Sequence, residues 1–223
     1  MNYDTLSLFV HAVPLVFAAI FPVLNPIGSA ILVLPFTTGV DTPTRRLIAR
    51  KVAFYTFVVL TTVLFVGSHL LAFFGISIPV VQATGGLLLA SMGWKRLTAE
   101  DQTDSDKAGA SRPVAASLMD QTFYPFTFPM TVGPGSVAVT LTLSAHMVQD
   151  SFYRTLVSQG GALVGFFGLA ATVYLSFAYT VSLLKRIGPS GTRVILRLMS
   201  FLILCIGAQI SWSGIHALLL QVR

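Results

Sequence analysis

The sequence predicts an all-α integral membrane protein with six transmembrane helices. Of its 223 residues, 54% are hydrophobic and only 10% are charged, and the mean hydropathy is +0.80. Soluble domains have about a quarter of their residues charged. Six apolar runs meet or approach the ~20 residues that a helix needs to cross a bilayer; they cover residues 6–36, 48–74, 78–94, 119–145, 156–184 and 194–220. These runs do not alternate strictly between apolar and polar residues, which argues against β-barrel strands.

The basic residues predict the orientation of these helices. Twelve of the fourteen lysine and arginine residues lie between runs one and two, three and four, or five and six, and only Arg154 and Arg223 lie on the other side. The positive-inside rule makes the first side cytoplasmic, so both termini are expected outside the cytoplasm. The net charge of +6 is therefore expected to reflect contact with a lipid bilayer, and no nucleic acid is expected as a partner.

A polar segment divides the chain into two halves. Residues 95–117 are expected to form a cytoplasmic linker between a first three-helix repeat, residues 1–94, and a second, residues 118–223. Because each half has an odd number of helices, the halves must enter the membrane from opposite sides. The sequence therefore predicts two inverted three-helix repeats.

An internal match supports this division. Shifting FPVLNPIGSAILVL (residues 21–34) by 107 residues places it on FPMTVGPGSVAVTL (residues 128–141) without a gap. Pro26 lacks a backbone N–H, and Gly28 permits positive φ, so we expect the first helix to break near Asn25. The fourth helix is expected to break near Pro134 and Gly135, and Gly135 is the residue that matches Gly28.

Helix breaks within a bilayer require a cavity or protein that satisfies the freed N–H and C=O groups. Broken helices at matched positions of two inverted repeats are a pointer to the binding site of a secondary transporter. The N-terminus of each new half-helix favours an anion, so we expect a substrate carboxylate where the two breaks face each other. Simple kinks that aid packing are the alternative. The predicted binding residues are Asn25, Pro26, Gly28, Ser29, Gly133, Pro134, Gly135 and Ser136.

Two motifs resemble a known family. NPIGSAILVLPFTT (residues 25–38) and PFTFPMTVGPGS (residues 125–136) resemble segments of the MarC family of bacterial and archaeal inner-membrane proteins, and the resemblance extends over nearly the whole chain. The family is grouped with neutral amino acid transporters and is similar to the LysE superfamily of exporters. The resemblance implies a multi-pass protein of the bacterial inner membrane. The function it implies is secondary transport of small neutral amino acids or related small metabolites by alternating access.

Asp120, at the start of the fourth run, is the candidate for coupling transport to a proton or a sodium ion, and an interfacial position is its alternative. No metal or other cofactor is expected, because Cys205 is the single cysteine and the four histidines lack ligand spacing. The sequence has no phosphate loop, dinucleotide fingerprint or nucleophile elbow, so no enzyme activity is expected. A non-transporting membrane sensor or assembly protein is the alternative function. The sequence leaves open whether the chain forms a homo-oligomer.

Overall fold

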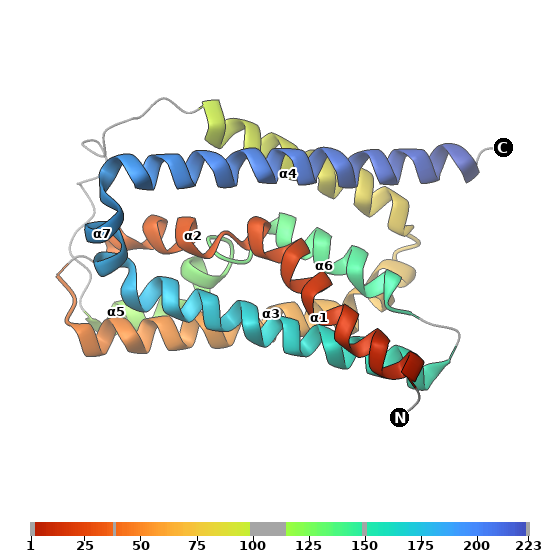
Figure 1. Cartoon of the computed structure of the whole chain (residues 1–223), viewed down its shortest axis with the longest axis horizontal. Helices are drawn as coiled ribbons and strands as arrows, with labels where there is room; N and C mark the ends of the chain where they lie inside the picture. Colours follow the sequence, from red (N-terminus) through yellow and green to blue (C-terminus); the bar gives the residue numbers. More distant parts are fainter. Residues whose placement is uncertain (1–2, 38, 99–114, 149–150, 222–223) are drawn as a thin grey trace.

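The chain is described by a computed structural model, in which residues 3–37, 39–98, 115–148 and 151–221 are placed. All regular elements in these ranges are helical. The helices lie along one long axis and form an elongated bundle, with the two chain ends at the same end of the bundle (Figure 1).

The first apolar run forms three consecutive pieces. These are α1 (Tyr3–Leu24), α2 (Pro26–Val33) and a short 3₁₀ helix, η1 (Leu34–Thr37). The interruption is at Asn25, whose φ of 44° and ψ of 63° are left-handed. Pro26 occupies the first turn of α2, where its missing N–H leaves no helical hydrogen bond unmade. The helix is therefore interrupted at the residue where the sequence places the break.

The next two helices are continuous. α3 (Thr42–Phe73) begins after Asp41, whose side chain accepts a hydrogen bond from the backbone N–H of Thr44 and caps the helix. α4 (Ile78–Thr98) ends with Lys95 and Arg96 in its last turn. Cationic side chains at this end interact favourably with the helix dipole.

The fourth apolar run is the least regular. It contains α5 (Ala115–Asp120), a π-helical segment η3 (Thr122–Thr127), an irregular stretch and α6 (Pro134–His146). Pro125, Pro129 and Pro134 each lack the N–H that a continuous helix needs, so only the last part of the run is a regular helix of more than two turns. The expected fourth helix is thus an irregular half followed by a helical half.

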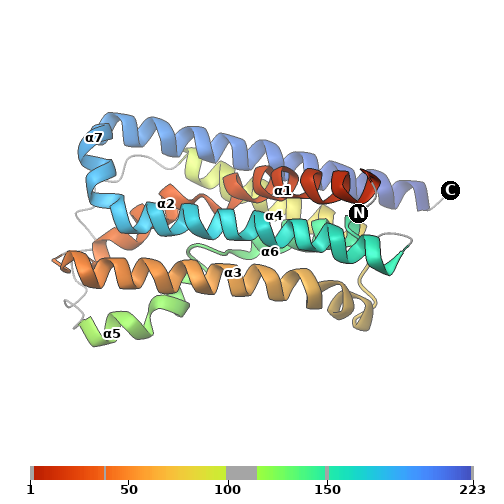
Figure 2. The same ribbon diagram turned by 60° about the horizontal axis from the view of Figure 1, so that its bottom comes forward.

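The fifth and sixth apolar runs form α7 (Phe152–Gln221), which consists of two helices joined at Gly188. Gly188 has a φ of 71° and a ψ of 171°, which favour glycine. The chain turns at this residue, so that the two halves of α7 run in opposite directions along the bundle (Figure 2).

Glycines bring several helices into backbone contact. A Cβ atom added to Gly161, in the first half of α7, would lie 2.7 Å from the backbone oxygen of Phe9 in α1. A Cβ atom added to Gly93 in α4 would lie 2.8 Å from the backbone oxygen of Ser200 in the second half of α7. Close approach through small residues is the usual way in which helices associate in membranes. Gly161 and its neighbour Gly165 therefore serve helix packing.

Four segments of the described chain are long and apolar enough to cross a membrane: Ser7–Thr37, Thr42–Gly67, Phe152–Gly188 and Ser190–Gln221. α6 has 13 residues and is therefore only about 20 Å long, which is shorter than the ~30 Å hydrocarbon core. α4 has 21 residues, but it includes polar residues such as Gln82 and Thr84 and ends with two basic residues. Length and composition therefore support an all-helical multi-pass protein. By these two criteria alone, α4 and α6 are not among the candidate membrane spans.

Candidate functional site

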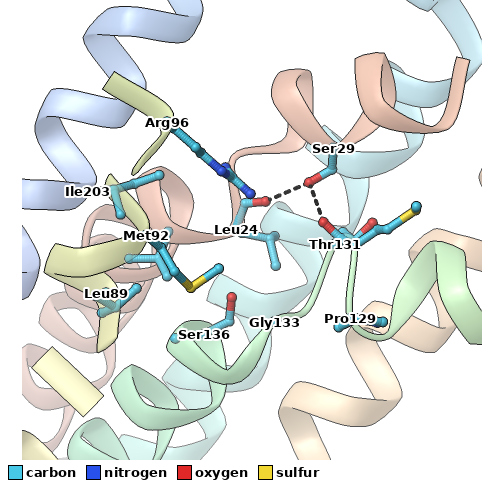
Figure 3. A pocket seen from close by; sticks show the side chains of 13 residues that line it. Leu24, Ser29, Leu89, Met92, Arg96, Pro129, Thr131, Gly133, Ser136 and Ile203 are labelled. Carbon is cyan, nitrogen blue, oxygen red and sulfur yellow. Dashed lines mark hydrogen bonds between the residues drawn. The ribbon is translucent and has the colours of Figure 1, made fainter. Parts of the chain in front are cut away.

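A cavity of about 30 Å³ lies where the two interrupted runs meet (Figure 3). Its walls are the end of α1, the first turns of α2 and α6, the stretch before α6, and parts of α4 and α7. A buried water molecule needs at least about 10–15 Å³ of such volume, so the cavity has room for one or two. Its lining residues are Val23, Leu24, Ser29, Leu89, Met92, Arg96, Pro129, Met130, Thr131, Gly133, Gly135, Ser136 and Ile203.

The first break, at Asn25, satisfies its own polar groups. The Asn25 backbone N–H donates to Phe21 O at 2.9 Å, and the Asn25 carbonyl accepts from the Ser29 N–H at 2.9 Å. The Asn25 side-chain oxygen accepts from the Gly28 N–H at 3.2 Å. This side chain packs so closely on Gly28 that a Cβ atom added there would lie 2.7 Å from the Asn25 Cγ. Asn25 therefore caps α2, and both of its carbonyl oxygens accept hydrogen bonds from within the break.

Ser29 connects the first break to the second. Its hydroxyl group lies 3.0 Å from Leu24 O and 3.1 Å from Met130 O, in the stretch before α6. A hydroxyl group carries one hydrogen, so it donates to one of these carbonyl oxygens at a time. The oxygen of Ser29 retains lone pairs that face the cavity and can accept a hydrogen bond.

The second break leaves polar groups without an internal acceptor. α6 begins after Gly133, which has no side chain to cap the helix, and Pro134 has no N–H. The N–H groups of Gly135 and Ser136 lie in the first turn, where no helical carbonyl can accept from them. Both residues line the cavity. The N-terminus of α6 is therefore open towards the cavity.

The Ser136 hydroxyl group has no hydrogen-bond partner in the structure, although the residue is only 1% exposed. Its Oγ atom points into the cavity between the start of α6 and α4 (Figure 3). Most buried polar groups have a partner, and a buried group without one costs free energy. Ser136 thus presents to the cavity a hydroxyl group that is available to a water molecule or a polar ligand.

Arg96 supplies the one cationic group among the residues that line the cavity. It projects from the last turn of α4, and its guanidinium group points towards the break at Leu24 and Ser29 (Figure 3). The residue as a whole is exposed and lies at the mouth of the cavity, where the surrounding protein partly desolvates its guanidinium group. No acidic side chain lies among these lining residues.

The structure divides the predicted binding residues into two groups. Ser29, Gly133, Gly135 and Ser136 line the cavity. Asn25, Pro26 and Gly28 are buried beside it and are not among the lining residues, and Pro134 is exposed. The prolines and Asn25 thus shape the two breaks, whereas Ser29 of the first break and Gly133, Gly135 and Ser136 of the second face the cavity.

Asp120 lies at the end of α5 and is exposed. It is not one of the residues that line the cavity. Its position favours the interfacial alternative over a direct contact with a bound substrate.

Sequence reasoning missed Leu89, Met92 and Arg96. These residues follow one another at intervals of three and four, so they lie on one face of α4. That spacing, with an arginine at its end, is the signal that could have identified them. A Cβ atom added to Gly135 would lie 2.9 Å from the Leu89 Cγ, so Leu89 closes the cavity over the start of α6.

Sequence comparison relates the chain to known proteins. A family model described as MarC family integral membrane protein matches residues 10–219. The chain belongs to the MarC family. The inner membrane proteins MarC of Escherichia coli (strain K12) and of Shigella flexneri are each 26% identical to it over 215 residues, which cover 94% of this chain and 96% of each relative. No solved structure is significantly similar to it. This MarC-family chain is therefore a multi-pass protein of the bacterial inner membrane.

Proposed function

We propose that this MarC-family protein is a secondary transporter that carries small neutral amino acids or related small metabolites across the inner membrane by alternating access. The observation that carries the proposal is the cavity between two interrupted helices, with the open N-terminus of α6 and the unpartnered hydroxyl group of Ser136 in its wall. Interrupted helices that meet within the membrane are the usual substrate sites of such carriers. No catalysed reaction and no cofactor are part of the proposal.

Reciprocal packing of α4 and the second half of α7 supports two inverted three-helix repeats. A Cβ atom at Gly86 would lie 2.6 Å from Gly207 O, and one at Gly207 would lie 2.7 Å from Gly86 O. A two-fold axis between the helices would exchange these two contacts. Each glycine is followed seven residues later by another that packs on the partner helix, Gly93 and Gly214. This is the arrangement expected of the third helices of two inverted repeats, with six crossings in all.

The second helices of the proposed repeats support the same relation. In the first repeat, α3 packs on α6, and the Ser144 hydroxyl group of α6 donates to Leu64 O at 2.7 Å. In the second repeat, the first half of α7 packs on α1, where a Cβ atom at Gly165 would lie 3.1 Å from the Val16 Cβ. Each second helix thus packs on the first helix of the other repeat.

The positions of the basic residues support an orientation with both termini outside the cytoplasm. Basic residues near the start of α3, at the end of α4 and before Gly188 lie at the end of the bundle opposite to the chain ends (Figure 1). The positive-inside rule makes that end cytoplasmic. Arg96 and the mouth of the cavity would then face the cytoplasmic side. A proton or a sodium ion is the proposed coupling ion.

The small volume of the cavity is the observation that favours the alternative, a membrane sensor or assembly protein. A cavity of about 30 Å³ is too small for glycine. In the transport proposal this is a contracted state without substrate, which widens when Leu89 and Met92 change their side-chain conformations. Methionine is well suited to this because its side chain is unbranched and flexible.

Counterflow in proteoliposomes tests the proposal. Vesicles that contain the purified protein are loaded with unlabelled glycine, alanine, serine or threonine, and the entry of the labelled compound is followed. We expect exchange of at least one of these amino acids, and none in vesicles without the protein. No exchange of any of them by correctly folded protein would contradict the proposal and favour the sensor or assembly role.

A further inference from the structure

The polar groups around the cavity include several hydrogen-bond donors and one unbalanced positive charge. Donors come from the Arg96 guanidinium group, the N–H groups of Gly135 and Ser136, and the Ser136 hydroxyl group. The lining residues include no carboxylate that could balance Arg96. The nearest acceptors, Leu24 O and Met130 O, lie within hydrogen-bond distance of the Ser29 hydroxyl group. The cavity therefore offers strong donors and one positive charge that no lining carboxylate balances.

This set of donors matches one carboxylate group. A guanidinium group presents parallel N–H donors that bind both oxygens of a carboxylate. The first-turn amides of α6 and the positive end of its dipole favour the same negative charge from the opposite wall. The 1% exposed hydroxyl group of Ser136, which has no partner, adds one more donor between them. One arginine compensates a single negative charge, so a monocarboxylate fits better than a phosphate ester.

We infer that Arg96 and the N-terminus of α6 bind the carboxylate group of the transported substrate, and that this carboxylate is the essential recognition element. The inference rests on the proposed transport function and names its substrate class, which is small monocarboxylates with or without an amino group. The ammonium group of an amino acid would have no acidic side chain to pair with in the lining. Removing that ammonium group from the substrate should therefore weaken binding less than neutralising the carboxylate. Small carboxylates without an amino group should therefore compete with amino acids for the site.

The geometry also limits the size of the group that enters. Leu89 and Met92 line the cavity between Arg96 and the start of α6 (Figure 3). Both side chains must move before a carboxylate fills the space. Short-chain carboxylates are the best match to this space.

Calorimetric titration of the purified full-length protein in detergent tests the inference. The probes are acetate and alanine, which carry a carboxylate, with acetamide as the neutral isostere of acetate and chloride as a simple anion. The protein variants are Arg96→Gln, Arg96→Lys and the matched control Lys95→Gln, which removes a neighbouring charge that does not line the cavity. Size-exclusion profiles and helical content establish that each variant is folded.

We expect acetate and alanine to bind, acetamide to bind at least about tenfold more weakly than acetate, and chloride not to displace acetate at equal concentration. Arg96→Gln should weaken acetate binding by at least about tenfold, since a charge-assisted pair is lost, and Lys95→Gln should leave it unchanged. The acetate affinity of Arg96→Lys should lie between those of Arg96→Gln and the parent protein, because lysine keeps the charge and loses the paired donors. No carboxylate binding, equal binding of acetate and acetamide, displacement by chloride, or an unchanged affinity in Arg96→Gln would each overturn the inference.

The same variants in counterflow separate this inference from the proposed function. Arg96-dependent carboxylate binding without any exchange would leave the site standing and contradict transport. Exchange that proceeds equally well in Arg96→Gln would support transport and refute the role of Arg96.

Discussion

The two helix breaks have matching sequences but use their polar groups differently. At the first break, Asn25 caps α2 with its side chain and accepts the Ser29 N–H with its carbonyl group. At the second break, the position that matches Asn25 is Val132, and Gly133 leaves the N-terminus of α6 without a side-chain cap. Ser29 has two carbonyl oxygens within reach, whereas the matching Ser136 has no partner. The first break therefore makes hydrogen bonds within itself, whereas the second leaves a buried hydroxyl group and an uncapped helix N-terminus, on which the proposed binding site rests.

The difference shows how a repeated motif can acquire two roles. An internally satisfied break holds the bundle together and needs no ligand. An unsatisfied break costs free energy unless water or a ligand provides the missing partner. A carrier needs a site of the second kind, and the first kind supplies a rigid wall for it.

Gly135→Leu should have the largest effect. A side chain at this position would collide with Leu89 and fill the cavity, so substrate exchange should fall to the background of empty vesicles. Gly160→Leu is the control, because the nearest atom to an added Cβ there is 3.8 Å away, in the ring of Phe9. Counterflow rates normalised to folded protein provide the measurement. Normal exchange by Gly135→Leu would show that the second break is not the substrate site.

Asn25→Ala should destabilise the folded protein by about 2 kcal/mol, because it removes the cap of α2 and places alanine in a left-handed conformation. Asn25→Gly should cost much less, since glycine adopts that conformation readily. Melting temperatures in one detergent would compare the two variants with the parent protein. Equal stability of Asn25→Ala and the parent protein would refute the structural role of the first break.

The matched serines should differ in stability. Ser29→Ala removes a buried hydroxyl group that donates to Leu24 O or Met130 O, so we expect a loss of about 1 kcal/mol. Ser136→Ala removes a buried hydroxyl group without a partner, so the stability of the unliganded protein should stay constant or rise slightly. Thermal unfolding of both variants without substrate measures this difference. A larger loss in Ser136→Ala than in Ser29→Ala would reverse the proposed assignment.

Met92→Ala should have the smallest effect. It enlarges the cavity without removing a polar group, so we expect exchange of larger amino acids to rise by a few-fold relative to glycine. Competition of leucine with labelled glycine in counterflow would detect the change. Ile210→Ala, a partly buried side chain of α7 outside the cavity lining, is a control of similar size. An unchanged preference in Met92→Ala would contradict the role of this side chain in closing the site.

Much of this arrangement could be predicted from the sequence because its causes are local. Proline removes a backbone donor wherever it occurs, so Pro26 and Pro134 located the breaks without any knowledge of the fold. The low charge and long apolar runs likewise predicted a helical membrane protein, which the family match and the apolar helices confirm. The irregular half before α6 was harder to predict, because its course depends on what packs around three closely spaced prolines.

The roles within the site depend on contacts that the sequence does not contain. Asn25 was expected to contact a substrate, but its side chain caps α2 because the left-handed backbone brings it onto the Gly28 N–H. Arg96 was counted only as one of the basic residues that set the orientation. Its proposed role depends on the packing of α4 beside both breaks, which places Leu89, Met92 and Arg96 on the face that lines the cavity.

The most direct test of the contrast is counterflow by Asn25→Gly and Ser136→Ala in the same vesicle preparation, at one temperature and with labelled alanine. We expect Asn25→Gly to keep an exchange rate close to that of the parent protein, whereas Ser136→Ala should lose most of its exchange at low alanine concentration and recover at high concentration. Normal exchange by Ser136→Ala together with a loss in folded Asn25→Gly would contradict the account and move the substrate site to the first break.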